Sequence, residues 1–331
     1  MNGNKIVTIG ITMGDPSGIG PEIILKSFEK EFIRSSRLLV IGDFKIMELA
    51  HSMLKISSFS LKKVNNISEC DFQNDTFNIL DINTIDLNVF SPGKVQASSG
   101  DAAYQSVVKA IDLANHCELD AVVTAPLNKE AMNLSGHFFP GHTEVFANFT
   151  NTANYAMLLY DPRLSVIHVS THISLLESIK GLRKKRIEEV IELAHFIMKK
   201  ICGRDPRIAV AGINPHAGEN GMFGDEEIKQ IAPAVKNMKE KGYLVEGPYP
   251  PDTVFLQAFK GKFDIVVAMY HDQGHIPLKL IGFDSGVNIT VGLPFVRTSV
   301  DHGTAFEIAW QGIANEGSMV EAIRIALQLS S

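Results

Sequence analysis

The sequence has few features of membrane, secreted or disulfide-bonded proteins. No apolar run reaches the roughly 18 residues that a membrane-spanning helix needs, so no membrane partner is predicted. The start, MNGNKIVTIGITMGD, lacks the basic and apolar regions of a signal peptide. Only three cysteines occur among 331 residues, Cys70, Cys117 and Cys202, and none forms a C-x-x-C pair. We therefore expect a cytoplasmic protein with reduced thiols.

Neither sign of charge dominates the chain. The formal net charge is -6, and the charged residues are spread along the sequence, so no nucleic-acid partner is predicted. The basic run KGLRKKR, 180–186, lacks interleaved aromatic residues and precedes an acidic helical segment, which is typical of a solvated face. An anionic substrate would therefore have to be held by locally placed cations.

Short, nearly continuous apolar runs recur along the chain, as in strands buried on both faces of a sheet. They begin at Lys5, Leu38, Leu119, Ser165, Arg207, Phe263 and Val287. Helical patterns lie between them; in RIEEVIELAHFIMKK, 186–200, apolar residues recur every three to four positions. This alternation predicts an α/β fold with mostly parallel strands.

Three histidines, His172, His216 and His271, each follow a predicted strand. Ligands of open α/β sheets bind at the carboxyl ends of strands, so these imidazoles are expected to converge. Together they would suit Zn²⁺ or another borderline divalent ion. The alternative is that each is a separately satisfied polar residue at a loop entrance. The shared context of all three favours the metal site.

Two segments suggest anion binding. In GHTEVFA, His142 and Thr143 are expected where a loop enters a helix, and exposed amides there can receive an anion. Alternatively, Thr143 caps the helix and His142 faces solvent. Lys279 and Arg297 lie near strand-like segments in otherwise apolar surroundings, PLKLIGF and GLPFVRTSV, where an unpaired cation would be costly to bury. Their predicted partner is a phosphate or carboxylate; the alternative is a salt bridge to Asp284 or Asp301.

The opening TMGDPSGIGPEI resembles a nucleotide loop only superficially. Its glycines form neither G-x-G-x-x-G nor a P-loop that ends in G-K-[ST]. We interpret it as a tight turn into a helix, with Pro21 at the first helical position and Glu22 complementing the helix N-terminus.

Several motifs nevertheless resemble one family in order and over almost the whole chain. They are TMGDPSGIGPE, TAPLNKEA, PGHTE, THISL, GINPHAGE, MYHDQGH and GVNITVGLPFVRTSVDHGTAFEIA. This set resembles the 4-hydroxythreonine-4-phosphate dehydrogenase family of vitamin B6 (pyridoxine) biosynthesis, with its branch acting on D-threonate or D-erythronate 4-phosphate. The segment HDQGHIPLK, with His275, is similar to that branch.

The resemblance implies two α/β domains with an active-site cleft between them, as in isocitrate and isopropylmalate dehydrogenases. The cofactor-side domain would comprise 1–145 and 286–331, and the metal, substrate and dimerisation domain 146–285. It also implies a homodimer whose active site is shared between subunits, so that one metal ligand can come from the partner chain.

The resemblance assigns roles to single residues as well. It implies a metal site for Zn²⁺, Mg²⁺, Co²⁺ or Mn²⁺ at His172, His216 and His271. The implied substrate-binding residues are His142, Thr143, Lys279, Asn288 and Arg297. Candidates for binding NAD are His302, Gly303 and Thr304, and candidates for acid–base catalysis, by position, are Asp272 and Lys279.

The implied reaction is NAD-dependent oxidation of 4-phosphohydroxy-L-threonine followed by β-decarboxylation, which gives 3-amino-2-oxopropyl phosphate and CO2. A sugar-acid phosphate, D-threonate or D-erythronate 4-phosphate, is the alternative substrate. Two readings from other classes are a non-catalytic phosphometabolite-binding protein and a metal-dependent hydrolase. An intact set of three histidines argues against the former, because a phosphate binder needs no metal.

Overall fold

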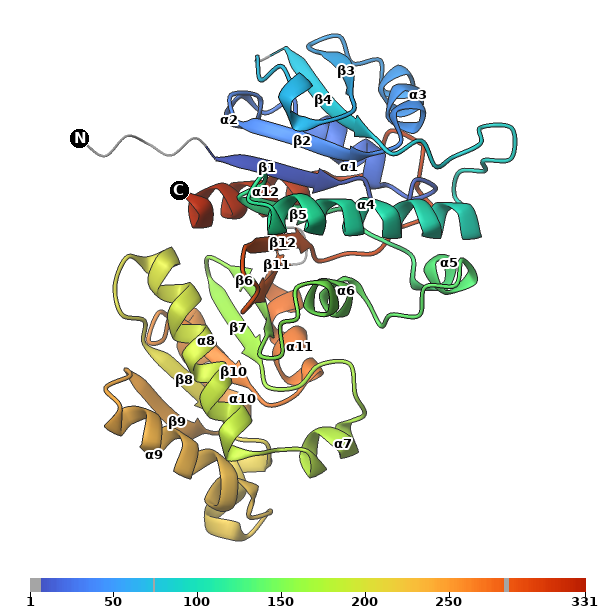
Figure 1. Cartoon of the computed structure of the whole chain (residues 1–331). Coiled ribbons are helices and arrows are strands. Elements are labelled where there is room, and N and C mark those ends of the chain that lie inside the picture. Colours follow the sequence, from blue (N-terminus) through green and yellow to red (C-terminus); the bar gives the residue numbers. More distant parts are fainter. Residues whose placement is uncertain (1–6, 74, 283–285) are drawn as a thin grey trace, which may run out of the picture. The chain divides into compact units, whose positions relative to one another are not determined.

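The computed structural model describes residues 7–73, 75–282 and 286–331. The chain divides into two compact units (Figure 1). The first comprises Met1–Thr152 and Leu293–Ser331, and the second comprises Ala153–Gly292. Among the described residues, no helix combines the length and apolar character that crossing a membrane would require.

The first unit is built on parallel strands. Their spatial order is β3 (Ser60–Val64), β4 (Thr76–Asp81), β2 (Arg37–Gly42), β1 (Thr8–Thr12), β5 (Ala121–Thr124) and β12 (Val296–Val300). Every pair of neighbours in this order is parallel. Strands β1 and β5 are buried along their whole length, and the sequence of β5 is almost continuously apolar.

Helices cover this sheet. They are α1 (Gly20–Ser27), α2 (Glu31–Arg34), α3 (Phe44–Leu54), α4 (Ala97–Asn115), α5 (Lys129–Leu134), α6 (His142–Phe149) and α12 (Gly317–Ser330). Helix α4 packs on β1, β2 and β5, and α12 packs on β5 and β12. A short 3-10 turn, Ile67–Glu69, follows β3. Leu39, Val107, Ile111 and Val122 belong to the core between α4 and the strands.

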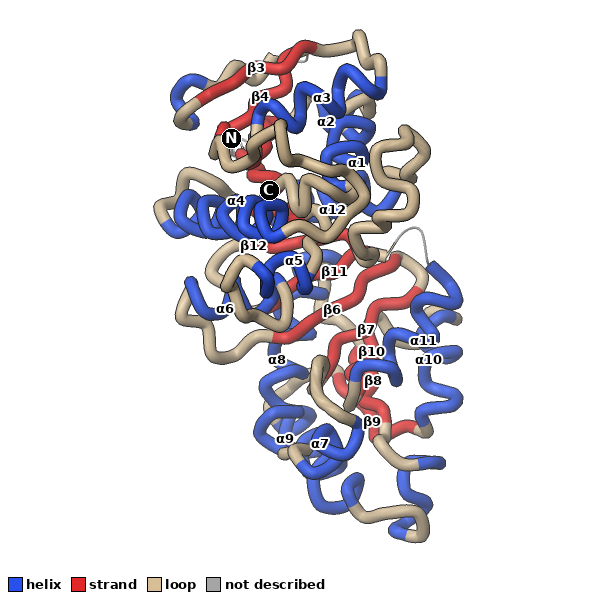
Figure 2. Tube along the Cα trace, turned by 90° about the vertical axis from the view of Figure 1, so that its right-hand side faces the viewer, coloured by secondary structure: helices blue, strands red, loops and turns tan. Residues whose placement is uncertain are grey.

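The second unit is built on a mixed sheet, whose strands are the lower red segments in Figure 2. Its strand order is β11 (Val287–Val291), β6 (Ala156–Asp161), β7 (Leu164–His168), β10 (Ile265–Ala268), β8 (Ile208–Ala211) and β9 (Val245–Tyr249). The pairs β11–β6 and β6–β7 are antiparallel. The strands from β7 to β9 run parallel.

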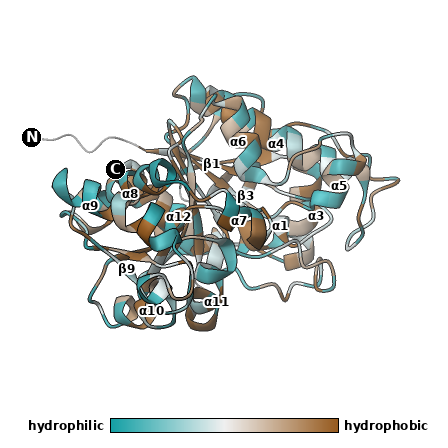
Figure 3. Cartoon of the chain, turned by 90° about the horizontal axis from the view of Figure 1, so that it is seen from below, coloured by the Kyte–Doolittle hydropathy of each residue, from teal (hydrophilic) through white to brown (hydrophobic). Residues whose placement is uncertain are grey.

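The helical segments of this unit include a 3-10 turn and one turn of π-helix. They are α7 (Leu175–Lys180), α8 (Lys184–Cys202), the 3-10 turn Pro215–Gly221, the π-helical turn Glu227–Ile231, α9 (Ala232–Glu240), α10 (Pro251–Phe259) and α11 (His271–Gly282). Helix α8 buries Ile187, Val190, Ile191 and Ala194, as its periodicity predicts, and Gly203 caps its C-terminus in the left-handed conformation. Figure 3 shows hydrophobic and hydrophilic residues alternating along the helices, the pattern of amphipathic packing.

Candidate active site

The three predicted metal-binding histidines follow three neighbouring strands of the second unit. Strands β7, β10 and β8 are adjacent and parallel, so their carboxyl ends lie at one edge of the sheet. His172 lies in the bend after β7, His216 in the turn after β8, and His271 begins α11 after β10. The three imidazoles thus come from the sheet edge where ligands of such folds bind.

Within one chain, two of these histidines are close together. The ring centroids of His172 and His271 are 5.9 Å apart, and both residues line a pocket of about 300 Å³. The His216 ring instead lies beside Phe223, with 6.1 Å between centroids. Among the residues that the structure describes, no three His, Cys, Asp or Glu side chains are grouped so as to hold a metal ion.

The side chains themselves fit a divalent ion. His172 and His216 are exposed and His271 is partly exposed, so their imidazoles are accessible. His271 donates from Nδ1 to Oδ1 of Asp272 at 2.6 Å, and this hydrogen bond lowers the pKa of Asp272. A carboxylate that holds one ring nitrogen leaves Nε2 oriented for a metal, the usual arrangement behind a histidine ligand. Imidazole donors suit the borderline ions predicted from the sequence.

Two further histidines, which sequence reasoning did not place in the site, lie behind His271. His275 stacks on His271 with 3.6 Å between centroids, and its Nδ1 is 3.0 Å from the carbonyl of His271. The buried His168 ring lies 4.9 Å from that of His275. Burial lowers the pKa of His168 to about 3 and that of His275 to about 4, so both are uncharged at neutral pH. The sequence signal that could have placed His275 in the site is its spacing of four residues from His271, which puts both on the same face of a helix.

His216 lies in an unusual backbone conformation. From His216 to Asn220, five consecutive residues have φ between 40° and 81°, a left-handed turn. For a residue other than glycine this conformation costs roughly 1–2 kcal/mol. Surrounding contacts must therefore hold the turn in place.

Buried and partly buried hydrogen bonds link the three strand ends that precede the histidines. Gln273 accepts from the amide of Met269 after β10 and donates to the carbonyl of Gly212 after β8, both at 2.6 Å. Ser170, after β7, donates to the carbonyl of Met269 at 2.9 Å. The relative positions of the three loops are therefore fixed by side-chain to backbone bonds.

In the first unit, the buried Arg297 lies close enough to the half-buried His142 for its charge to act on that imidazole. Arg297 on β12 is 1% exposed, donates to Oγ1 of Thr124 at 2.6 Å and lies 5.3 Å from the ring centroid of Phe146. Burial lowers its pKa to about 9, which leaves it charged at neutral pH. Burial also lowers the pKa of His142 well below its usual value, with the charges of Arg297 and Lys129 adding to the effect.

This group is suited to an anion. His142 begins α6, and its Nε2 is buried without a hydrogen-bond partner. Thr143, the next residue, is buried. A guanidinium ion and a helix N-terminus together are typical of phosphate or carboxylate sites. The N-cap of α6 is Gly141 and no side chain caps the helix, so the alternative that Thr143 is the cap is wrong.

The structure corrects the prediction for Lys279. This lysine is exposed on α11, so it does not lie in a buried strand-like segment. Arg297 is a buried cation, as predicted, and the charge of the Glu144 carboxylate favours its protonated form by raising its pKa. The alternative partner Asp284 lies outside the described residues. Asn288, on β11, has its Oδ1 buried without a hydrogen-bond partner.

Of the three cofactor candidates, Thr304 contacts the opening glycine-rich turn of the first unit. The carbonyl of Thr304 accepts from the amide of Ile19 at 3.0 Å, and a Cβ on Gly18 would come within 2.9 Å of Thr304. Nε2 of His302, beside Gly303, is buried without a hydrogen-bond partner.

Asp15, in the same turn, is fully buried. One carboxyl oxygen accepts from the amide of Ser17 at 2.8 Å, and the other has no hydrogen-bond partner. Burial raises the pKa of Asp15 to about 7. Sequence reasoning treated this segment only as a turn into a helix, and a buried carboxyl group there was not foreseen.

The arrangement of strands defines a known fold class. The chain is similar in fold to isocitrate dehydrogenase from Methylococcus capsulatus, with a TM-score of 0.51 at 15% sequence identity over 97% of this chain and 85% of that one. At this identity the likeness shows the fold alone. The predicted α/β fold of this class is confirmed.

The chain belongs to the family of the pyridoxal phosphate biosynthetic protein PdxA, whose model matches residues 34–326. It is 52% identical to D-threonate 4-phosphate dehydrogenase from Pectobacterium atrosepticum, over 97% of this chain and 99% of that protein. A crystal structure of 4-hydroxythreonine-4-phosphate dehydrogenase from Klebsiella pneumoniae matches with a TM-score of 0.88 and 49% identity, over 98% of this chain and all of that one. The predicted family, an oxidoreductase family, is confirmed.

Proposed function

We propose that this protein is a dehydrogenase of a 4-phosphorylated four-carbon hydroxy acid that depends on NAD and a divalent metal, with D-threonate 4-phosphate as the first candidate substrate. The observation that carries the choice of substrate is the 52% identity, over nearly the full length, to a relative named for it. The alternative is 4-phosphohydroxy-L-threonine, the substrate class in the name of the Klebsiella enzyme.

We assign the metal to His172, His216 and His271, with Asp272 orienting His271. When bound, a divalent ion would act as a Lewis acid that favours loss of the substrate hydroxyl proton. Arg297, His142 and Thr143 would bind one anionic end of the substrate, and Lys279 and Asn288 are our candidates for contacts to the remainder. The first unit would then be the cofactor-side domain, with NAD near His302, Gly303 and Thr304.

The chemistry follows from the position of the hydroxyl group. Oxidation at C3 of D-threonate 4-phosphate transfers a hydride to NAD and releases a proton, which leaves a ketone β to the carboxylate. Breaking the C1–C2 bond then releases CO2 and leaves its electron pair as an enolate, which protonation at C2 converts to dihydroxyacetone phosphate. The amino acid phosphate would give 3-amino-2-oxopropyl phosphate. Lys279 is our candidate for the proton transfers.

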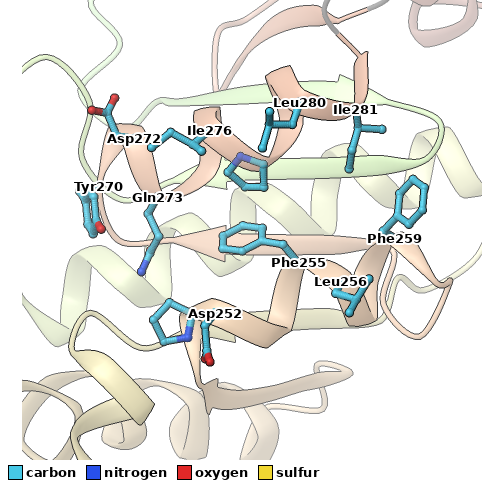
Figure 4. Close-up of a pocket in the computed structure, with 12 residues that line it drawn as sticks. Asp252, Phe255, Leu256, Phe259, Tyr270, Asp272, Gln273, Ile276, Leu280 and Ile281 are labelled. Carbon is cyan, nitrogen blue, oxygen red and sulfur yellow. The ribbon is translucent and has the colours of Figure 1, made fainter.

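We further propose that the active site is completed in a homodimer. One chain gathers His172 and His271 but leaves His216 apart, as described above. Next to Asp272, helices α10 and α11 form an apolar groove of about 610 Å³ (Figure 4). Leu256, Phe259, Ile276 and Leu280 line it with exposed fractions between 43% and 83%. Such a patch favours contact with a second copy of the chain.

The test is NAD reduction at 340 nm by metal-reconstituted protein, with D-threonate 4-phosphate, D-erythronate 4-phosphate and 4-phosphohydroxy-L-threonine offered separately. We expect turnover with a sugar-acid phosphate, CO2 release, and loss of activity with a chelator. Turnover with 4-phosphohydroxy-L-threonine alone would instead assign the protein to the dehydrogenase reaction of vitamin B6 biosynthesis. Turnover without NAD would indicate a hydrolase, and metal and phosphate binding without turnover would indicate a binding protein.

A further inference from the structure

Glu227, the first residue of the π-helical turn, is a buried carboxylate with no role in the reaction above. It is 3% exposed, and it makes no ion pair with a cation in the described part of the chain. A buried charge is costly unless hydrogen bonds stabilise it, so its contacts indicate why it is there.

The side-chain hydrogen bonds of Glu227 all go to the segment that leads into the His216 turn. Oε1 accepts from the amides of Ile213 and Asn214, both at 2.8 Å. Oε2 accepts from Nδ2 of Asn214 at 2.9 Å. One carboxylate thus binds three N–H groups immediately before the left-handed turn.

The turn also fits closely around this carboxylate. A Cβ added to Gly218 would lie 2.8 Å from Oε2 of Glu227, and one added to Gly212 would lie 3.0 Å from Oε1. Gly218 has φ of 81°, so its lack of a side chain serves both the conformation and the close approach. The backbone before and after His216 therefore packs closely against the Glu227 carboxylate.

From this geometry we propose that Glu227 is the positioning residue that presents His216 to the metal. The inference rests on the proposed metal role of His216. The carboxylate compensates for the unfavourable left-handed turn and fixes where its imidazole lies, without touching metal or substrate. A histidine ligand whose loop is released should bind the metal less tightly, because ordering the loop then opposes binding.

The matched variants are Glu227→Gln and Glu226→Gln. Glutamine at position 227 has the size of glutamate, and its oxygen can still accept from the two backbone amides. Its NH2 group, however, would face Nδ2 of Asn214, and two donors cannot hydrogen-bond to each other. Glu226 contacts the same Nδ2, at 2.7 Å, but no backbone amide of the turn, so it is the control. A third variant, His216→Ala, reports whether His216 binds metal at all.

The experiment titrates the purified, metal-free full-length protein with Co²⁺ and follows its visible absorption, with thermal unfolding of the metal-free form measured alongside. We expect Glu227→Gln to weaken Co²⁺ binding about 10- to 100-fold, as loss of a supporting residue commonly does, while Glu226→Gln binds like the parent protein. Equal Co²⁺ affinity in Glu227→Gln and the parent would overturn the inference, as would equal weakening by Glu226→Gln. If His216→Ala leaves Co²⁺ binding unchanged, the metal assignment itself fails.

Discussion

Among single residues, Asp15 has the pKa with the clearest consequence for stability. Its pKa of about 7 in the folded protein lies above the ordinary value of 3.8 for an aspartate. The folded protein therefore holds a proton that the unfolded chain releases, and the free energy of unfolding falls as pH rises between these two values.

We expect Asp15→Asn to relieve this cost. An amide has no charge to bury and keeps the oxygen that accepts from Ser17. The free energy of unfolding of the parent falls as pH rises, and that of the variant does not. The difference between variant and parent should therefore grow by about 2–3 kcal/mol from pH 5 to pH 8. Urea denaturation at several pH values measures this. A difference that does not change with pH would mean that Asp15 titrates normally.

The placement of some of these residues could be predicted from the sequence and that of others could not. The positions of His172, His216 and His271 after strands were predictable because each follows a continuous apolar run, which local composition reveals. Glu227 was not, because its role depends on a backbone turn and a π-helical turn that no local pattern specifies. The error for Lys279 has a physical cause: Pro277 disfavours a helix interior, yet α11 continues through it.

At the scale of elements, strands such as β5 and β10 were predictable because burial on both faces demands apolar runs. The predicted runs did not include β3, β4, β6, β9 and β12. Of these, β3 and β9 are only partly buried and their sequences are polar or contain proline. The contact of Gln273 with two strand ends was also beyond sequence reasoning, since Gly212 is far away in the chain.

We expect Gln273→Leu to loosen the edge of the sheet. It would leave the amide of Met269 and the carbonyl of Gly212 without their partner, at a cost of about 2–4 kcal/mol in free energy of unfolding. The control Gln105→Leu removes an exposed glutamine from α4 and should change stability by less than about 0.5 kcal/mol. Urea denaturation compares the two, and similar values would contradict this view of Gln273.

At the scale of the whole molecule, a shared active site can be tested by mixing inactive variants. The variants are His172→Ala, His216→Ala and His271→Ala. They are mixed in pairs, and each mixture is assayed after its subunits have exchanged. If one histidine comes from the partner chain, its variant should complement both others, because the mixed dimer then contains one intact site. Equal mixing should restore about a quarter of the parent activity, since half the dimers are mixed and each has one working site.

The same experiment identifies the histidine that crosses the interface. The two variants whose histidines belong to one chain should not complement each other, and this pair is the internal control. Sedimentation of each mixture confirms that dimers are present. Failure of all three pairs, with exchange demonstrated, would contradict a site shared between subunits.

The burial of Arg297 has a consequence for how fast an anion is captured. Salt ions cannot come close to this guanidinium, whereas the net charge of -6 repels the proposed anionic substrate at long range. Moderate ionic strength should therefore leave kcat/KM unchanged or raise it, because screening weakens the repulsion more than the final contact. Steady-state rates at increasing KCl check this, and a steep fall would mean that exposed cations guide the substrate.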